Sequence, residues 1–97
     1  MDFLKKLCTI QAPSGSEYVM TKFLLSYIKN EQKNWKVQPE IIYGDDFQDC
    51  IVLVFGEPRT AIFAHMDSVG YTVGYKNNLI KIGGPAAKKG AILVGED

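Results

Sequence analysis

The hydrophobic positions in the first third of the chain recur with the period of an α-helix. Between residues 15 and 33 the apolar side chains fall at i, i+3, i+4, i+7 and i+8, as Met20, Phe23, Leu24, Tyr27 and Ile28. This spacing is typical of a helix with one buried stripe. Just before it, Ser14 and Glu17 have the spacing of a capping box, in which each side chain bonds the other residue's amide. We therefore predict a helix over residues 15–33, capped by Ser14.

A shorter helix is predicted at the start of the chain. Asp2 can cap this helix, and the apolar residues Phe3 and Leu7 share one of its faces. The helix should end before Pro13, because the residue that precedes a proline disfavours helical dihedral angles. The chain is thus expected to open with two amphipathic helices.

After residue 34 the hydrophobic period becomes that of short strands. Apolar runs bounded by Gly, Pro, Asn or Asp predict six strands, at residues 35–43, 49–55, 59–65, 69–75, 79–82 and 91–94. The runs at 49–55 and 59–65 are apolar on both faces, which is typical of strands at the centre of a covered sheet. We therefore predict an α/β fold in which the two N-terminal helices pack on a mixed β-sheet. Two helices can cover only one face of such a sheet.

Composition and charge argue against several classes of protein. The 97 residues are 46% hydrophobic and 23% charged, ordinary values for one globular domain. Eleven Lys and Arg balance eleven Asp and Glu, so the basic surface of a nucleic-acid-binding protein is not expected. No apolar run approaches the ~20 residues that cross a bilayer, and the first residues lack the features of a signal peptide. We expect neither a nucleic-acid nor a membrane partner.

The candidate chemistry lies where the predicted strand at residues 59–65 ends. His65 and Asp67 are two residues apart, so in an extended chain their side chains project to the same face. A metal-binding histidine commonly donates its second ring N–H to a carboxylate or a carbonyl group, and Asp67 offers such a carboxylate. The residues alone still favour a structural histidine, because a catalytic metal site usually needs three protein ligands and the sequence has one histidine.

Three stretches together resemble the start of the dinuclear metallo-aminopeptidases of the glutamyl aminopeptidase and cellulase M type. Residues 7–17 (LCTIQAPSGSE) are similar to the opening helix and turn of that family. Residues 60–73 (TAIFAHMDSVGYTV) resemble its hallmark, an apolar strand running into His-Met-Asp-x-x-Gly, and residues 79–84 (LIKIGG) resemble its next hairpin with paired glycines. The chain departs from the family at Ser68, where glutamate is frequent, and at Asp49, where an asparagine usually follows the turn.

The resemblance implies an enzyme that hydrolyses N-terminal residues of peptides with a metal-activated water. It implies two divalent metal ions, zinc or cobalt, with His65 as a terminal metal ligand and Asp67 in the catalytic site as the carboxylate that orients His65. Residues 1–70 would be the N-terminal part of the catalytic domain, and residues 71–97 the start of an incomplete β-rich inserted domain. The family's other ligands and its glutamate base come later in the chain, so the 97 residues alone are expected to be inactive. The resemblance also implies a cytoplasmic homo-oligomer that acts on peptide substrates.

A second class of protein stays open beside the peptidase. The chain would then be a complete small α+β binding or interaction module without catalysis, with His65 in a structural role. The two alternatives predict different surfaces. A complete module should cover the apolar strands at residues 49–55 and 59–65, whereas part of a larger domain should leave a face or an edge of them open.

Overall fold

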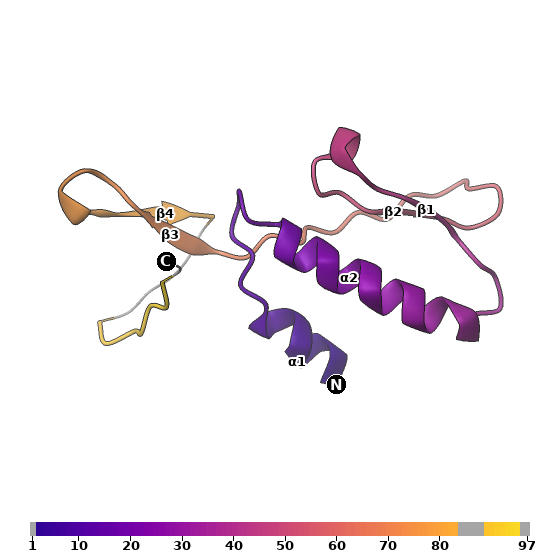
Figure 1. Cartoon of the computed structure of the whole chain (residues 1–97), viewed down its shortest axis with the longest axis horizontal. Coiled ribbons are helices and arrows are strands. Elements are labelled where there is room, and N and C mark those ends of the chain that lie inside the picture. Colours follow the sequence, from indigo (N-terminus) through magenta and orange to yellow (C-terminus); the bar gives the residue numbers. More distant parts are fainter. Residues whose placement is uncertain (1, 84–88, 96–97) are drawn as a thin grey trace.

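The chain folds into two α-helices and two small antiparallel sheets (Figure 1). A computed structural model describes residues 2–83 and 89–95. Its elements are α1 (Asp2–Thr9), α2 (Tyr18–Glu31), β1 (Glu40–Ile42), β2 (Val52–Val54), β3 (Gly70–Val73) and β4 (Leu79–Ile82), with short 3-10 turns at Gln32–Asn34, Asp45–Phe47 and Tyr75–Asn77. The mixed helix and strand content agrees with the predicted class. In the described part of the chain, no helix has the length and apolar character needed to cross a membrane.

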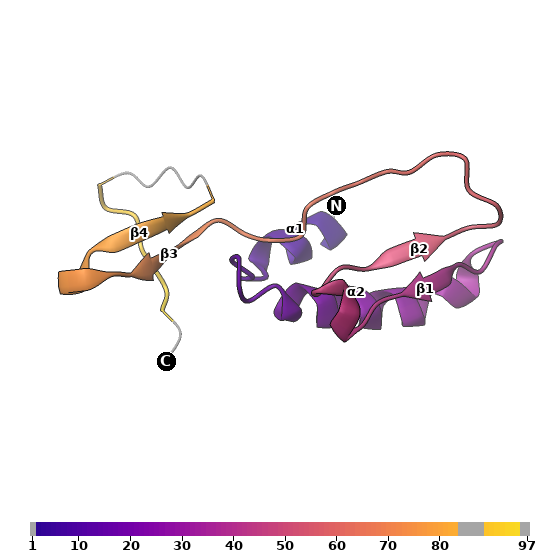
Figure 2. The same cartoon turned by 90° about the horizontal axis from the view of Figure 1, so that it is seen from above.

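Each sheet consists of two antiparallel strands. In the first sheet β1 pairs with β2, and Glu40 lies opposite Val54. In the second sheet β3 pairs with β4, and Gly70 lies opposite Ile82. The turn that joins β3 to β4 contains Asn77 with a φ of +61°, the left-handed conformation that asparagine adopts more readily than most residues. The β3–β4 sheet lies apart from the helices and from the β1–β2 sheet (Figures 1 and 2).

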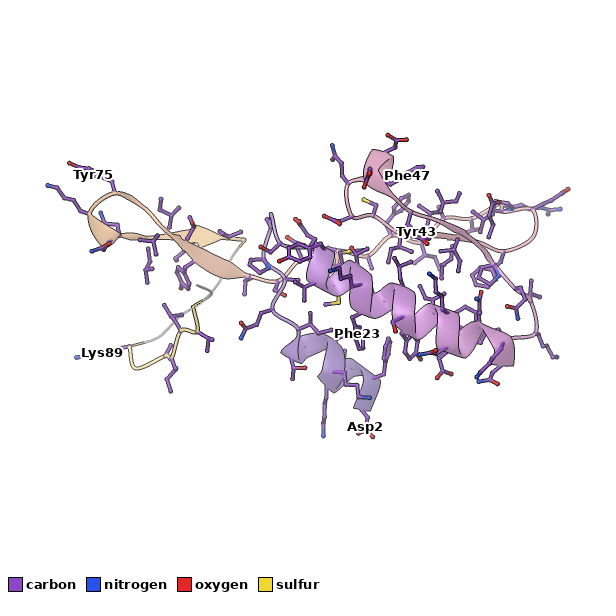
Figure 3. The ribbon with its side chains drawn as sticks, in the orientation of Figure 1. Asp2, Phe23, Tyr43, Phe47, Tyr75 and Lys89 are labelled. Carbon is purple, nitrogen blue, oxygen red and sulfur yellow. The ribbon has the colours of Figure 1, made fainter. Side chains whose placement is uncertain are left out.

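Helix α2 lies between α1 and the β1–β2 sheet and carries most of the small core (Figure 1). Met20 and Ile28 of the predicted stripe are buried, and the other stripe residues are half-buried. The ring of Phe3 in α1 stacks on Tyr27 with centroids 4.2 Å apart, and it lies 6.4 Å from Phe23. Figure 3 shows Phe23 on the side of α2 that faces α1. The stripe is therefore confirmed, but its aromatic members pack on α1 and not on a sheet.

The N-terminus of α2 differs from the prediction. The helix begins later than expected, and its N-cap residue Glu17 makes no capping bond with its side chain. Before it, the Ser16 amide donates to the Pro13 carbonyl oxygen at 2.8 Å, in a turn where Gly15 has a φ of +96°. A residue with this φ cannot continue a right-handed helix. The predicted capping box is therefore wrong, and the Ser14 side chain bonds elsewhere.

The predicted single mixed sheet is also wrong. Residues 59–65, expected at its centre, form no strand, and Ile62 and Phe63 are 94% and 91% exposed. Residues 91–94 form no strand either. A strand that is apolar on both faces needs a layer on each face and a neighbour for its backbone groups. The described residues supply neither to residues 59–65, and this is the physical reason for the difference.

The exposed surface of the chain is large for its mass. The accessible area is 8422 Å², whereas a compact monomer of this mass exposes roughly 5,500 Å². The radius of gyration is 16.5 Å, against about 12.5 Å for a compact domain of this length. Among the described apolar residues only Ala12, Met20 and Ile28 are buried. The apolar segment at residues 59–65 is part of this large exposed surface. The domain boundary predicted between residues 70 and 71 stays a prediction.

Replacing Ile28 with alanine is expected to lower the free energy of unfolding by about 2–5 kcal/mol, because apolar contacts are lost and a cavity is left. Urea unfolding followed by far-UV circular dichroism measures this change. Ser26→Ala, at an exposed position of α2, is the matched control and should change the free energy by less than about 0.5 kcal/mol. Equal effects of the two substitutions would contradict the packing of α2.

Candidate functional site around His65

The segment that carries His65 is attached to the start of α2. The Thr21 hydroxyl donates to the Asp49 carbonyl oxygen at 2.7 Å and lies 3.4 Å from Met66 Sδ. Thr21 is only 9% exposed, so this hydroxyl needs a partner within the protein. The Met66 side chain, next to His65, therefore lies against the first turns of α2.

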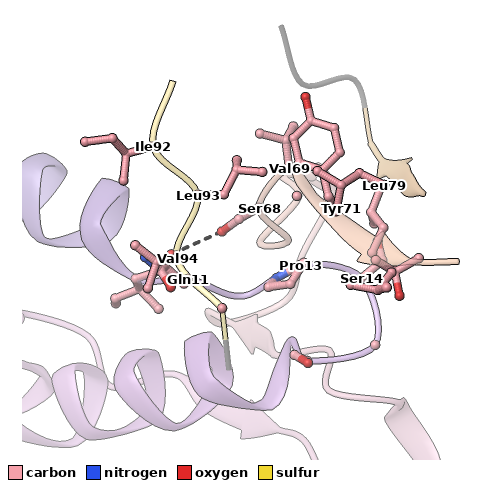
Figure 4. A pocket seen from close by; sticks show the side chains of 18 of the residues that line it. Gln11, Pro13, Ser14, Ser68, Val69, Tyr71, Leu79, Ile92, Leu93 and Val94 are labelled. Carbon is pink, nitrogen blue, oxygen red and sulfur yellow. Dashed lines mark hydrogen bonds between the residues drawn. The ribbon is translucent and has the colours of Figure 1, made fainter. Parts of the chain in front are cut away.

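A second attachment joins the loop between the helices to Ser68. The Ser68 amide donates to the Ala12 carbonyl oxygen at 2.7 Å. The Ser68 hydroxyl accepts from the Ala12 amide at 3.1 Å and donates to the Ile10 carbonyl oxygen at 3.1 Å. We call these three hydrogen bonds the Ala12–Ser68 clasp. Ala12 is fully buried beneath it, and Figure 4 shows Ser68 above the loop with its bond to that loop dashed.

Position 70, next to the clasp, leaves little room for a side chain. Pro13 and Ser68 form an isolated parallel bridge, which brings the proline ring against the start of β3. A Cβ atom at Gly70 would lie 3.2 Å from Pro13 Cβ, closer than ordinary van der Waals contact between carbon atoms. The glycine in the His-Met-Asp-x-x-Gly stretch thus has a local steric reason in this chain.

Beside the clasp, the side chains of Ser14, Asp67 and His65 form one hydrogen-bonded row. The Ser14 hydroxyl donates to Asp67 Oδ2 at 3.0 Å. The other carboxylate oxygen, Oδ1, lies 3.1 Å from His65 Nδ1, and the Asp67 carbonyl oxygen lies 3.2 Å from the same nitrogen. Both neighbours of Nδ1 are acceptors, so Nδ1 must carry the proton to bond either one, and Nε2 then keeps its lone pair in the neutral ring.

The row is open to solvent. The side chain of His65 is 86% exposed and that of Asp67 is 37% exposed, so His65 is not a core histidine. The hydroxyl of Ser14 first, and the ring of His65 second, hold the pKa of the Asp67 carboxyl group below its usual value. Each does so by hydrogen bonding to the charged form. The carboxylate is therefore ionised at neutral pH and available as an acceptor.

The row has the residue types of an acyl-transfer triad but the wrong order. In such a triad the histidine lies between the serine and the carboxylate, so that the imidazole can take the proton of the hydroxyl. Here the carboxylate of Asp67 lies between Ser14 and His65. Ser14 therefore bonds to the carboxylate, which leaves it unactivated as a nucleophile.

Of the two ring nitrogens of His65, Nε2 is the one that could bind a metal ion, because Nδ1 carries the proton that bonds to Asp67. In the part of the chain that the structure describes, no three His, Cys, Asp or Glu side chains converge to hold such an ion. A site at His65 would need ligands from elsewhere. The contact between His65 and Asp67 is present as their spacing predicts, while the roles of both residues in metal binding stay predictions.

A separate hollow of about 990 Å³ lies between the loop after α1, the β3–β4 sheet and residues 92–95 (Figure 4). Its labelled walls are mostly apolar and include Tyr71, Leu79 and Leu93. Ser14 and Ser68 line it, whereas His65 and Asp67 are not among its described lining residues. The hollow is therefore a neighbour of the row and not the place where His65 points.

Sequence reasoning identified His65 and Asp67 but missed the serines that hold them. The sequence pattern predicts that Ser14 caps α2, and it marks Ser68 only as a departure from a family pattern. The turn signal at Gly15 was the available hint against the cap. The chain matches no protein-family model and no curated protein, so the interpretation of the site depends on its residues and geometry.

Ser14→Ala is expected to raise the pKa of Asp67 toward the ordinary value of 3.8, because the largest stabiliser of the carboxylate is removed. A carbon-13 NMR titration of the carboxyl group measures this pKa. Since the pKa is lowered in the folded chain, the row stabilises the fold above the pKa of the unfolded chain, and this stabilisation is lost as pH falls through the folded pKa.

The control for this titration is Ser16→Ala, two residues away, which leaves the Ser14 hydroxyl in place. Ser16→Ala should leave the pKa of Asp67 as it is in the unsubstituted chain. An unchanged pKa in Ser14→Ala would show that the bond between Ser14 and Asp67 is not formed in solution.

Proposed function

We propose that this chain is the N-terminal portion of a metal-dependent aminopeptidase, in which His65 is a terminal metal ligand and Asp67 orients it. One observation carries the proposal. The Nδ1 atom of His65 is paired with Asp67 while the ring is 86% exposed, the arrangement that leaves Nε2 free for a ligand. The resemblance of residues 60–73 to the hallmark of the family supports the same assignment.

His65 and Asp67 together fit one metal-ligand position of such a dinuclear site. A neutral imidazole nitrogen suits zinc and other divalent transition metals, and Asp67 supplies the carboxylate that commonly accepts from the second ring nitrogen. Two divalent metal ions, zinc or cobalt, would supply Lewis acidity and water activation when bound. The residues of this chain hold the His65 ring in one direction and keep a proton on Nδ1. The further ligands and the general base would come from outside the 97 residues.

The open surface around residues 59–65 favours this proposal over a complete small binding module. Ile62 and Phe63 are almost fully exposed. Burying such side chains contributes about 1.5–3 kcal/mol each, a large share of the stability of a small domain. A complete module would be expected to cover them, whereas the first part of a larger domain leaves them for later polypeptide to cover.

The resemblance extends the proposal beyond the site. Residues 1–70 would belong to the catalytic domain, and residues 71–97 would begin a β-rich inserted domain. The enzyme would be a cytoplasmic homo-oligomer acting on peptides, and the 97 residues alone would be inactive.

In the full-length protein, His65→Ala is expected to lower the metal content and to abolish aminopeptidase activity while the fold stays intact. Asp67→Asn should be milder and weaken metal binding about 10- to 100-fold, because Asp67 acts on the metal only through His65. Metal content by plasma mass spectrometry and release of N-terminal residues from short peptides measure the two effects.

The matched control is Glu57→Gln, an exposed carboxylate in the same connection between β2 and β3 but distant in sequence from the row at His65, which should retain both metal and activity. Circular dichroism of each variant separates loss of function from loss of fold. Full activity and unchanged metal content in His65→Ala would contradict the proposal.

A further inference from the structure

The Ser14 side chain has no role in the helix that follows it, yet it is bonded across 53 positions of sequence. Its hydroxyl donates to Asp67 Oδ2 at 3.0 Å, and Glu17, its expected capping partner, instead accepts from the Gly15 amide at 3.0 Å. A hydrogen bond between two exposed side chains is normally weak, because water competes for both groups and the side chains lose freedom. Its effect here therefore depends on what holds the two groups together.

The Ala12–Ser68 clasp holds them together. It fixes the residue after Asp67 against the loop that leads to Ser14. Ser14 and Asp67 therefore meet without any further cost of closing the long loop between them. The hydroxyl and the carboxylate are already neighbours in the folded chain, so their bond needs only the choice of side-chain rotamers.

We propose that Ser14 is a positioning residue for His65. Its hydroxyl holds Oδ2 of Asp67, which turns Oδ1 toward His65 Nδ1 and keeps the ring proton on that nitrogen. Nε2 is then the ring nitrogen that can bind a divalent metal ion. The identity of the ligand rests on the proposed function, whereas the tautomer of His65 does not.

Asp67 alone would specify the tautomer less strongly. An exposed carboxylate can rotate about its side-chain bonds, and a histidine in water finds no fixed partner for either nitrogen, so both neutral tautomers occur. Anchoring Oδ2 removes this freedom and leaves Oδ1 beside Nδ1. The Asp67 carbonyl oxygen, 3.2 Å from Nδ1, favours the same tautomer, so loss of Ser14 should weaken the preference without reversing it.

The histidine is unique in this chain, which makes its tautomer directly measurable. Long-range proton–nitrogen NMR on the nitrogen-15-labelled chain, at a pH where the ring is neutral, distinguishes Nδ1–H from Nε2–H. In the unsubstituted chain Nδ1–H should predominate. In Ser14→Ala the ratio of Nδ1–H to Nε2–H should fall about fivefold, the change that one ordinary hydrogen bond supplies.

Two further variants distinguish a positioning role of Ser14 from a purely structural role, in which its hydrogen bond only connects two loops. Ser14→Thr keeps the hydroxyl and should restore the ratio, whereas Ser16→Ala should leave it unchanged. The amide signals of Ala12 and Ser68 report in each variant whether the clasp remains. A ratio in Ser14→Ala equal to that of the unsubstituted chain, with the clasp intact, would overturn the proposal, as would a predominant Nε2–H tautomer in the unsubstituted chain.

The NMR samples contain no metal and no peptide substrate. The test of the role of Ser14 is therefore independent of the test of the proposed function. If the tautomer responds to Ser14 but His65→Ala retains metal and activity in the full-length protein, the positioning of His65 stands and the peptidase assignment fails. If the tautomer does not respond while His65→Ala loses metal, the peptidase assignment stands and the role of Ser14 fails.

Discussion

The position of His65 depends on the Ala12–Ser68 clasp, because the residues just before it lack the support of a sheet. Residues 59–65 form no strand, and among the described residues the attachments of this segment begin at Met66. Three consecutive residues then make three different attachments. Met66 lies against the Thr21 hydroxyl, Asp67 accepts from Ser14, and Ser68 closes the clasp. The segment that carries His65 is thereby attached to α2 and to the loop between the two helices.

Features that depend on local sequence could be predicted, whereas the long-range contacts of the Ala12–Ser68 clasp could not. The helices and the β3–β4 sheet follow from local periodicity and turn residues, and the spacing of His65 and Asp67 places them together in any extended chain. The partners Ser14 and Ser68 lie more than fifty positions from the residues they bond, and nothing in a local pattern specifies such pairing. The capping box failed for a local reason, because Gly15 adopts a positive φ that ends the helical path. The mixed sheet failed because a strand apolar on both faces forms only when cover is present.

The exposed apolar side chains of residues 59–65 lie next to the exposed row at His65. Ile62 and Phe63 lie just before His65, separated from it by Ala64, and Ile62, Phe63 and His65 are almost fully exposed. Polypeptide that covered the two apolar side chains would also approach the imidazole. In the proposed peptidase the residues that complete the sheet could thus also bring the missing metal ligands to Nε2, so folding and assembly of the site would be linked.

Hydrogen exchange at the Ser68 amide tests most directly whether the clasp holds this segment. If the clasp is closed in solution, this amide, bonded to the Ala12 carbonyl oxygen at 2.7 Å, exchanges at least about tenfold more slowly than its intrinsic rate. The amides of residues 61–64, which lie in the segment without a strand, should exchange close to their intrinsic rates. Exchange of the Ser68 amide as fast as that of residues 61–64 would show that the clasp is open in solution and that it does not hold the segment that carries His65.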